Sequence, residues 1–238
     1  MLHIIVPTCL ADDAVVDGFL KGIEPALYSL PQRDCRMYLV INSDEDGLWF
    51  DVGKLNRGAT VCAYLENRRI GYVGACNIGY RLADPADDDL VVILNDDLVF
   101  HGPWIEPLQA AIEDGAAVAG PSLKWVGRDG CWGHGDEKYQ YLEGWCFATT
   151  GGVIRRAARE IRMLNEPKDW PRGPVMFDPQ FAPAYCEDMD FCIRVQESGG
   201  KLAEVDVPVE HLHSMTYGTN RPSWARNREQ LMQKWELG

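Results

Sequence analysis

The sequence predicts a single α/β domain with a mainly parallel central sheet flanked by helices. Two observations carry this prediction. Strand-like apolar segments alternate with helix-like amphipathic segments along the first hundred residues, which is typical of βαβ units. The chain also has 238 residues, of which 46% are hydrophobic and 25% charged, as expected for one domain with a sizeable core.

The expected elements of this half follow one another in a regular order. The expected strands are "HIIVPT" at 3–8, "RMYLVIN" at 36–42, "ATVCAYL" at 59–65, "LVVIL" at 90–94 and "AAVAGPSL" at 116–123. The expected helices cover residues 14–30, 74–84 and 102–114. Because parallel strands need long crossover connections, the helices between these strands favour a sheet covered on both faces.

The pattern changes after Lys124. Residues 125–145 mix glycine, aromatic and charged residues and are expected to be irregular, before a helix near 155–164. A proline-containing stretch then leads to a helix over 187–198, which Gly199 and Gly200 end, and to a short strand. Long irregular segments in compact domains tend to carry function, so the second half is expected to supply functional loops.

Charge and composition exclude several classes of protein. The formal net charge of -13 disfavours extended nucleic-acid binding. No apolar run approaches the ~20 residues of a membrane helix, and the N-terminus enters a strand without a signal-peptide pattern, so we expect a cytoplasmic protein without an integral membrane segment. The eight cysteines are scattered without a CxxC pair, which favours reduced, buried thiols.

An acidic motif ends the fourth expected strand. The apolar run "LVVIL" stops at Asn95, Asp96 and Asp97, where open parallel sheets bind their ligands. Mg²⁺ and Mn²⁺ prefer oxygen ligands and are commonly held by one or two carboxylates together with substrate phosphates. Taken alone, a turn in which Asp97 caps the next helix is an equally good interpretation.

A second acidic cluster opens the helix expected at 187–198. Glu187, Asp188 and Asp190 lie in its first turn, where the helix dipole favours carboxylates by about 0.3 to 1 kcal/mol each. Three carboxylates after the segment "FAPAY" exceed what capping requires. A carboxylate against an apolar wall gains proton affinity and suits general-base catalysis.

Two histidines follow the next strand. His211 and His213 are two residues apart, and on an extended chain their rings are expected to point to opposite sides. We therefore do not expect the two histidines to bind the same ion.

These segments, in this order, resemble the inverting, nucleotide-sugar-dependent glycosyltransferases of the GT-A fold, of the large family-two type that includes bacterial polysaccharide, rhamnosyl and galactosyl transferases. The segments that carry the resemblance are "HIIVPT", "NRRIGYVGACNIGYRLA", "VVILNDDLVF", "FDPQFAPAYCEDMDFCIRV", "VPVEHLHSMT" and "QLMQKW". The resemblance implies a Rossmann-like fold in one domain, with a nucleotide-sugar-binding half at 1–100, an acceptor and catalytic half at 101–218 and a tail at 219–238. It also implies a nucleoside-diphosphate sugar as donor, Mn²⁺ or Mg²⁺, and a saccharide or lipid-linked glycan as acceptor.

The resemblance implies roles for individual residues. Asn95, Asp96 and Asp97 match the DxD motif, with Asp97 as the metal ligand and His211 as its partner, or His213 after a small shift in alignment. Glu187 and Asp188 match the catalytic ED motif, in which Asp188 is the general base. The donor pocket is expected to include Pro7, Thr8, Asn42, Asp44, Arg69, Asn77, Asn95 and Asp96, with Gly71 and Gly74 allowing close backbone approach.

Two further segments have open interpretations. The tail carries Arg221, Arg226, Arg228 and Lys234, and it is either a lid over the diphosphate or a helix that packs Leu231, Met232 and Trp235 on the core. Trp132 and Trp145 either stack on a sugar ring or are packed.

Two other functions stay open at this point. A nucleotidyltransferase acting on a sugar phosphate uses the same kind of sheet and acidic metal site, although the sequence lacks a glycine-rich basic loop after the first strand. A non-catalytic module that binds a sugar nucleotide or a glycan is the other alternative, and the presence of two acidic clusters disfavours it.

Overall fold

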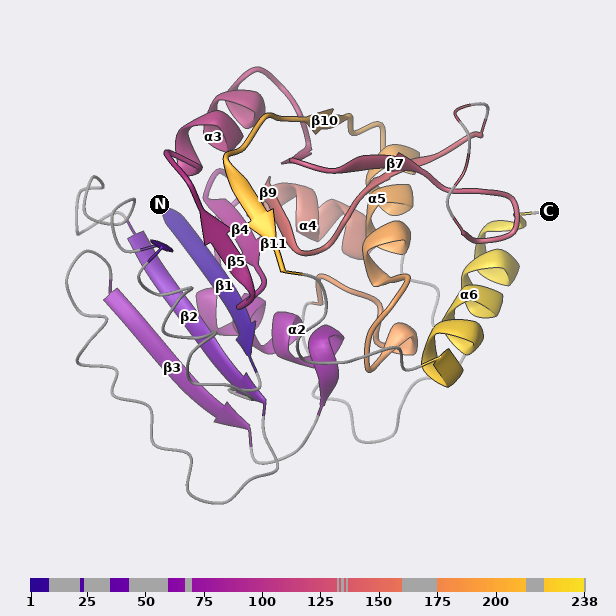
Figure 1. The fold of residues 1–238 in the computed structure, drawn as a ribbon, viewed down its shortest axis with the longest axis horizontal. Helices are drawn as coiled ribbons and strands as arrows, with labels where there is room; N and C mark the ends of the chain where they lie inside the picture. The colour runs from indigo at the N-terminus through magenta and orange to yellow at the C-terminus, as the bar shows by residue number, and fades with distance from the viewer. Residues whose placement is uncertain are drawn as a thin grey trace.

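The computed structural model describes residues 1–8, 22–23, 35–42, 60–66, 70–131, 133, 135, 137–159, 175–212 and 221–237. It contains a seven-stranded sheet with the strand order β10-β6-β9-β4-β1-β2-β3. β1, β2 and β3 lie side by side in this sheet (Figure 1). Its strands are β1 (Leu2–Thr8), β2 (Cys35–Asn42), β3 (Thr60–Glu66), β4 (Leu90–Leu94), β6 (Val118–Gly120), β9 (Cys146–Thr150) and β10 (Leu202–Glu204).

The sheet is mainly parallel, as the sequence predicts. β1 pairs in parallel with both β2 and β4, so the carboxyl ends of these three strands meet at one edge. β9 is the exception, because it runs antiparallel to β4 and β6. The sequence does not predict β9, because "CFATT" follows directly on a segment rich in glycine, aromatic and charged residues.

Apolar side chains fill both faces of the sheet. Ile5 and Val91 belong to a cluster that also contains residues of α2 (Gly71–Ala83), α4 (Gly151–Ala158) and α5 (Glu187–Glu197). Ile4 and Val92, their neighbours in sequence, belong to a second cluster with α3 (Ile105–Glu113). Successive residues of a strand point to opposite faces, which explains why these strands are apolar throughout.

A helix boundary differs from the expected one where glycines lie at the start of the helix. α4 begins at Gly151, before the expected residue 155, because the Thr150 side chain accepts a hydrogen bond from the Val153 N–H and caps the helix in front of two glycines. α5 lies where the sequence predicts a helix. The expected irregular region contains β8 (Gln140–Leu142), which pairs with β7 (Leu123–Trp125). The strand expected at 116–123 forms β6 and only the start of β7. Most of the expected helix at 14–30 lies outside the described residues.

A short antiparallel ladder joins distant segments beside the sheet. β5 (Leu98–Phe100) pairs with β11 (Val209–His211), and His211 lies opposite Leu98. The ladder continues with a hydrogen bond from the Leu212 N–H to the Asp97 carbonyl oxygen (3.0 Å). His211 is therefore held next to Asp97.

Two predictions from composition can be compared with the described residues. All seven described cysteines are free thiols, and five of them are buried, as predicted. None of the helices among these residues is both long enough and apolar enough to span a membrane.

Candidate active site

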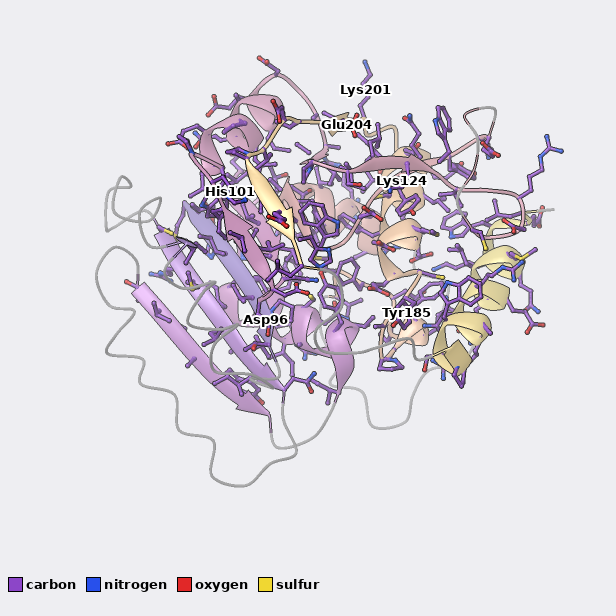
Figure 2. The ribbon with its side chains drawn as sticks, viewed as in Figure 1. Asp96, His101, Lys124, Tyr185, Lys201 and Glu204 are labelled. Atoms are coloured by element: carbon purple, nitrogen blue, oxygen red, sulfur yellow. The ribbon has the colours of Figure 1, made fainter. Side chains whose placement is uncertain are left out.

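A cleft of about 430 Å³ lies at the carboxyl ends of β1, β2 and β4. Asp96 lies on one side of it and Tyr185 on the other (Figure 2). Of the residues that the sequence assigns to the site, the cleft gathers Pro7, Thr8, Asn42, Asn95, Asp96, Asp97, Glu187, Asp188 and His211. The two acidic motifs thus face one cavity.

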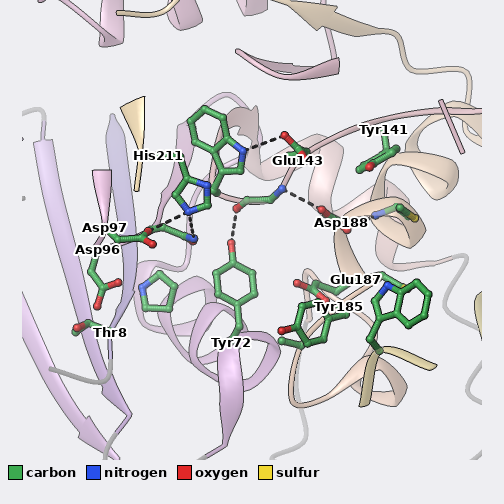
Figure 3. A pocket seen from close by; sticks show the side chains of 18 of the residues that line it. Thr8, Tyr72, Asp96, Asp97, Tyr141, Glu143, Tyr185, Glu187, Asp188 and His211 are labelled. Carbon is green, nitrogen blue, oxygen red and sulfur yellow. Dashed lines mark hydrogen bonds and ion pairs between the residues drawn. The ribbon is translucent and has the colours of Figure 1, made fainter. Parts of the chain in front are cut away.

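One end of the cleft is built around Asp97. Its carboxylate Oδ1 lies 3.1 Å from His211 Nε2, and Asn95 Nδ2 lies 3.3 Å from the same nitrogen (Figure 3). Asp97 does not cap a helix, because β5 follows it directly and α3 begins only at Ile105.

Trp145 fixes the His211 ring. The two rings stack with centroids 5.0 Å apart and planes 18° apart. The indole Nε1–H donates to Glu143 Oε2 (3.2 Å), which also accepts from the Ser122 hydroxyl. Trp145 is therefore packed against a candidate ligand, while Trp132, the other tryptophan considered for sugar stacking, lies outside the described residues.

The donor atoms at this end fit a hard divalent cation shared with a substrate. Asp97 offers carboxylate oxygens, and the His211 imidazole meets them at the same point. Among the described residues, no three His, Cys, Asp or Glu side chains gather around a common metal position. A cation held here would therefore take its remaining ligands from a bound molecule or from water.

The opposite end carries Asp188. Its Oδ2 accepts a hydrogen bond from the Gly144 N–H (3.0 Å), and its Oδ1 accepts one from the Met189 N–H (2.8 Å). Burial nevertheless raises the pKa of Asp188 to about 6. The Tyr72 hydroxyl donates to the Gly144 carbonyl oxygen (Figure 3), so Gly144 is held on both sides.

Glu187 is the more deeply buried of the two carboxyls. It is 6% exposed, and burial, followed by the charge of Asp188, raises its pKa well above the usual range. The backbone N–H groups of Tyr185 and of Glu187 itself partly oppose this shift. Within the described part of the chain, its Oε2 has no hydrogen-bond partner. Burial and the neighbouring charge of Asp188 therefore favour the protonated form of the Glu187 carboxyl.

Asp190, the third carboxylate of this turn, does not reach the cleft. It is fully buried and lies 2.8 Å from Arg194 Nε, 2.8 Å from Lys234 Nζ and 2.8 Å from Trp235 Nε1. Lys234 also binds Asp178 (2.6 Å). Asp190 thus anchors α6 (Arg221–Trp235) to α5 and has a structural role.

The structure corrects the expected role of Asn77. This residue is fully buried, its Nδ2 donates to the Phe177 carbonyl oxygen (2.8 Å), and its Oδ1 accepts from the N–H groups of Met176 and Phe177 (2.9 Å each). Its amide is therefore used within the protein and does not line the cleft. Asn77 thus forms hydrogen bonds with backbone groups that are distant in sequence, and it is not available to a ligand.

Gly71 also approaches protein and not ligand. A Cβ at Gly71 would lie 2.4 Å from Pro183 Cβ, and Gly74 is close to Ile70. Asp44, Arg69 and His213, which the sequence also proposes for the site, lie outside the described residues.

Several residues that line the cleft were not assigned to the site from the sequence. They are Tyr72, Tyr141, Glu143, Ala184, Tyr185, Cys186, Met189 and Trp224. Trp224 comes from α6, whose position depends on tertiary contacts with segments far away in the sequence. A tryptophan between arginines in a basic segment was the available signal in the sequence.

The sheet order and the placement of the cleft are those of the GT-A fold, and solved structures share this fold. A crystal structure of GalNAc-T7 with UDP, GalNAc and Mn²⁺ matches 98% of this chain with a TM-score of 0.68 at 14% identity. The mannosyltransferase PcManGT from Pyrobaculum calidifontis, in complex with GDP-Man and Mn²⁺, matches 99% with a TM-score of 0.58 at 16% identity. S. aureus TarS matches 82% with a TM-score of 0.52 at 14% identity.

The family model for glycosyl transferase family 2 matches residues 4–162, and the chain belongs to this family. No curated protein matches the sequence. The chain spans 47% of the GalNAc-T7 chain, 63% of the PcManGT chain and 33% of the TarS chain, and at these identities the likeness shows the fold alone. Glu187, Asp188, His211 and α6 lie beyond the residues that the family model matches.

Proposed function

We propose that the protein transfers a sugar from a nucleoside-diphosphate sugar to a hydroxyl of a saccharide or lipid-linked glycan, with inversion and with the help of a divalent metal. The observation that carries this proposal is the single cleft with two unlike acidic ends. Asp97 and His211 form one end, and Asp188 forms the other (Figure 3).

The Asp97 end suits the nucleoside diphosphate. Pro7 and Thr8 end β1, and Asn42 ends β2. These residues would contact the nucleoside, and Asn95 and Asp96 lie beside them. Asp97 and His211 would hold Mn²⁺ or Mg²⁺. When bound, the cation supplies positive charge that stabilises the diphosphate as it leaves. The GalNAc-T7 and PcManGT structures contain a nucleotide or nucleotide sugar with Mn²⁺, which supports this assignment.

The Asp188 end suits the acceptor. With a pKa of about 6, Asp188 is mostly ionised at pH 7.5 and can accept the proton of an acceptor hydroxyl. The acceptor oxygen forms a bond to the anomeric carbon while the bond from that carbon to the diphosphate oxygen breaks. Attack from the side opposite the leaving group inverts the configuration. The raised pKa of Glu187 favours its protonated form, which leaves Asp188 as the base.

A calorimetric titration tests the donor end. UDP, GDP and dTDP are titrated with and without Mn²⁺ into the wild type, Asp97→Asn and Leu82→Ala, whose exposed side chain lies outside the cleft. We expect one nucleotide to bind in a Mn²⁺-dependent way to the wild type and to Leu82→Ala, and to lose this dependence in Asp97→Asn.

Two results would count against the proposal. If nucleotide binding depended neither on Mn²⁺ nor on Asp97, the proposed metal site would be refuted. Release of pyrophosphate from a sugar phosphate and a nucleoside triphosphate would favour a nucleotidyltransferase.

A further inference from the structure

We propose that Trp224 is a stacking platform for a neutral sugar ring of the acceptor, at the Asp188 end of the cleft. This inference rests on the proposed function, because it assigns the acceptor a place relative to Asp188.

The two ends of the cleft differ in the side chains they offer. Thr8, Asp96 and Asp97 lie at one end, and Tyr185 and Asp188 lie at the other (Figure 3). Trp224 lines the cleft from α6 and is 40% exposed. The other large hydrophobic residues that are exposed in the described part of the chain, Met1, Tyr64, Leu82 and Leu212, do not line the cleft. Trp224 thus combines an exposed indole with a place at the site.

A cation supports one face of the Trp224 ring. The Arg228 guanidinium lies 5.5 Å from the ring centroid, and Arg228 is itself held by the Asp129 carboxylate (3.7 Å) and the Asp129 carbonyl oxygen. With one face supported in this way, the opposite face of the indole is the one that can receive a ligand.

Buried hydrogen bonds fix Trp224 relative to the base. Asn227, one turn further along α6, is fully buried, and its Nδ2 donates to the carbonyl oxygens of Phe181 (2.6 Å), Ala184 (2.8 Å) and Tyr185 (3.0 Å). These carbonyls immediately precede the helix that begins at Glu187. The platform and Asp188 therefore belong to one packed unit, which is what precise placement of an acceptor requires.

The chemistry of the two groups selects the ligand. Asp188 must reach the attacking hydroxyl, so the acceptor binds at this end of the cleft. One face of a pyranose ring presents mainly C–H groups and can pack on an indole, while its hydroxyls stay available for hydrogen bonds. The ionised Asp188 and the net charge of -13 disfavour an anionic acceptor. A neutral sugar offers a hydroxyl to Asp188, packs on the indole and carries no negative charge.

Substitutions that separate aromatic from merely apolar contact test this proposal. Trp224→Phe, Trp224→Leu and Leu82→Ala are compared with the wild type by saturation-transfer NMR with methyl glycosides of glucose, galactose, mannose and N-acetylglucosamine. Transfer to the glycoside that binds, and hydrolysis of the donor by water, are measured in parallel. Melting temperatures verify that each variant is folded.

We expect Trp224→Leu to raise the acceptor KM by about threefold to tenfold, the range of an aromatic contact, with donor hydrolysis unchanged. Trp224→Phe should keep most of the affinity. The proposal would be overturned if Trp224→Leu bound the glycosides as well as the wild type does. It would also be overturned if the wild type hydrolysed the donor but bound none of the glycosides. In both cases the proposed function would stand. Absence of both nucleotide binding and donor hydrolysis would instead refute the proposed function itself.

Discussion

The two ends of the cleft are built in different ways. At the Asp97 end, the side chains lie in the last residues of a strand or shortly after it, and one short ladder brings His211 to its place. At the Asp188 end, the side chains come from α5, α6 and the segment around Gly144, and buried polar contacts between distant segments hold them. The first end follows from the sheet, whereas the second depends on tertiary packing.

The family match covers each end only in part. Residues 4–162 include the sheet edge and Asp97 but neither Asp188 nor Trp224. The family match therefore includes Asp97 at the proposed donor end but not its partner His211. Asp188 and Trp224, at the proposed acceptor end, lie outside the match, and specificity particular to this chain would arise there.

Asp188→Asn should have the largest effect. Removing the general base is expected to lower the rate of transfer by about 10² to 10⁴ while nucleotide binding stays close to that of the wild type. Calorimetry and a transfer assay measure the two properties separately. A loss of nucleotide binding in this variant would show that the two ends are not separate, and full transfer activity would refute the assignment of the base.

The same substitution should also stabilise the fold above pH 6. The pKa of Asp188 is raised to about 6 from an ordinary 3.8, so between these values the folded state binds more protons than the unfolded state. The stability contributed by this group therefore falls as the pH rises through that window. Asp188→Asn should melt higher than the wild type at pH 7.5, and the difference should shrink towards pH 4.

Asp190→Asn tests whether packing holds the acceptor end. This carboxylate pairs with Arg194 and Lys234 in the interior, and removing one member of a buried ion pair costs about 3 to 5 kcal/mol. We expect a much lower melting temperature. The matched control is Lys138→Met, which breaks the exposed pair with Glu197 and should leave the melting temperature unchanged. Similar melting curves for both variants would contradict the structural role of Asp190.

These contacts also bear on the tail. Lys234 forms buried ion pairs with both Asp178 and Asp190, and Leu231 is fully buried. Both residues therefore support the interpretation that α6 packs on the core. Their burial does not favour a lid that delivers the Lys234 charge to a diphosphate.

The sequence predicts the two ends unequally for a physical reason. The end of an apolar run located Asp97 at the ligand-binding edge, and the family resemblance implied Thr8 and Asn42; all three lie in the cleft. The role of Asn77 could not be predicted from its neighbours, because the backbone groups that it satisfies are about a hundred residues away in sequence. Trp224 is similar, since its place depends on the Asn227 contacts and not on any local pattern.

Tyr72→Phe should have the smallest effect and gives the finest test of the acceptor end. The Tyr72 hydroxyl donates to the Gly144 carbonyl oxygen, and the Gly144 N–H donates to Asp188 Oδ2. Losing one hydrogen bond costs about 0.5 to 1.5 kcal/mol and loosens Gly144. Because the Gly144 N–H lowers the pKa of Asp188, a weaker contact should raise that pKa. The acid limb of the pH dependence of kcat should therefore move to higher pH, while the KM for the donor stays the same. A variant that changes stability without moving this limb would show that Tyr72 supports the fold and does not position the base.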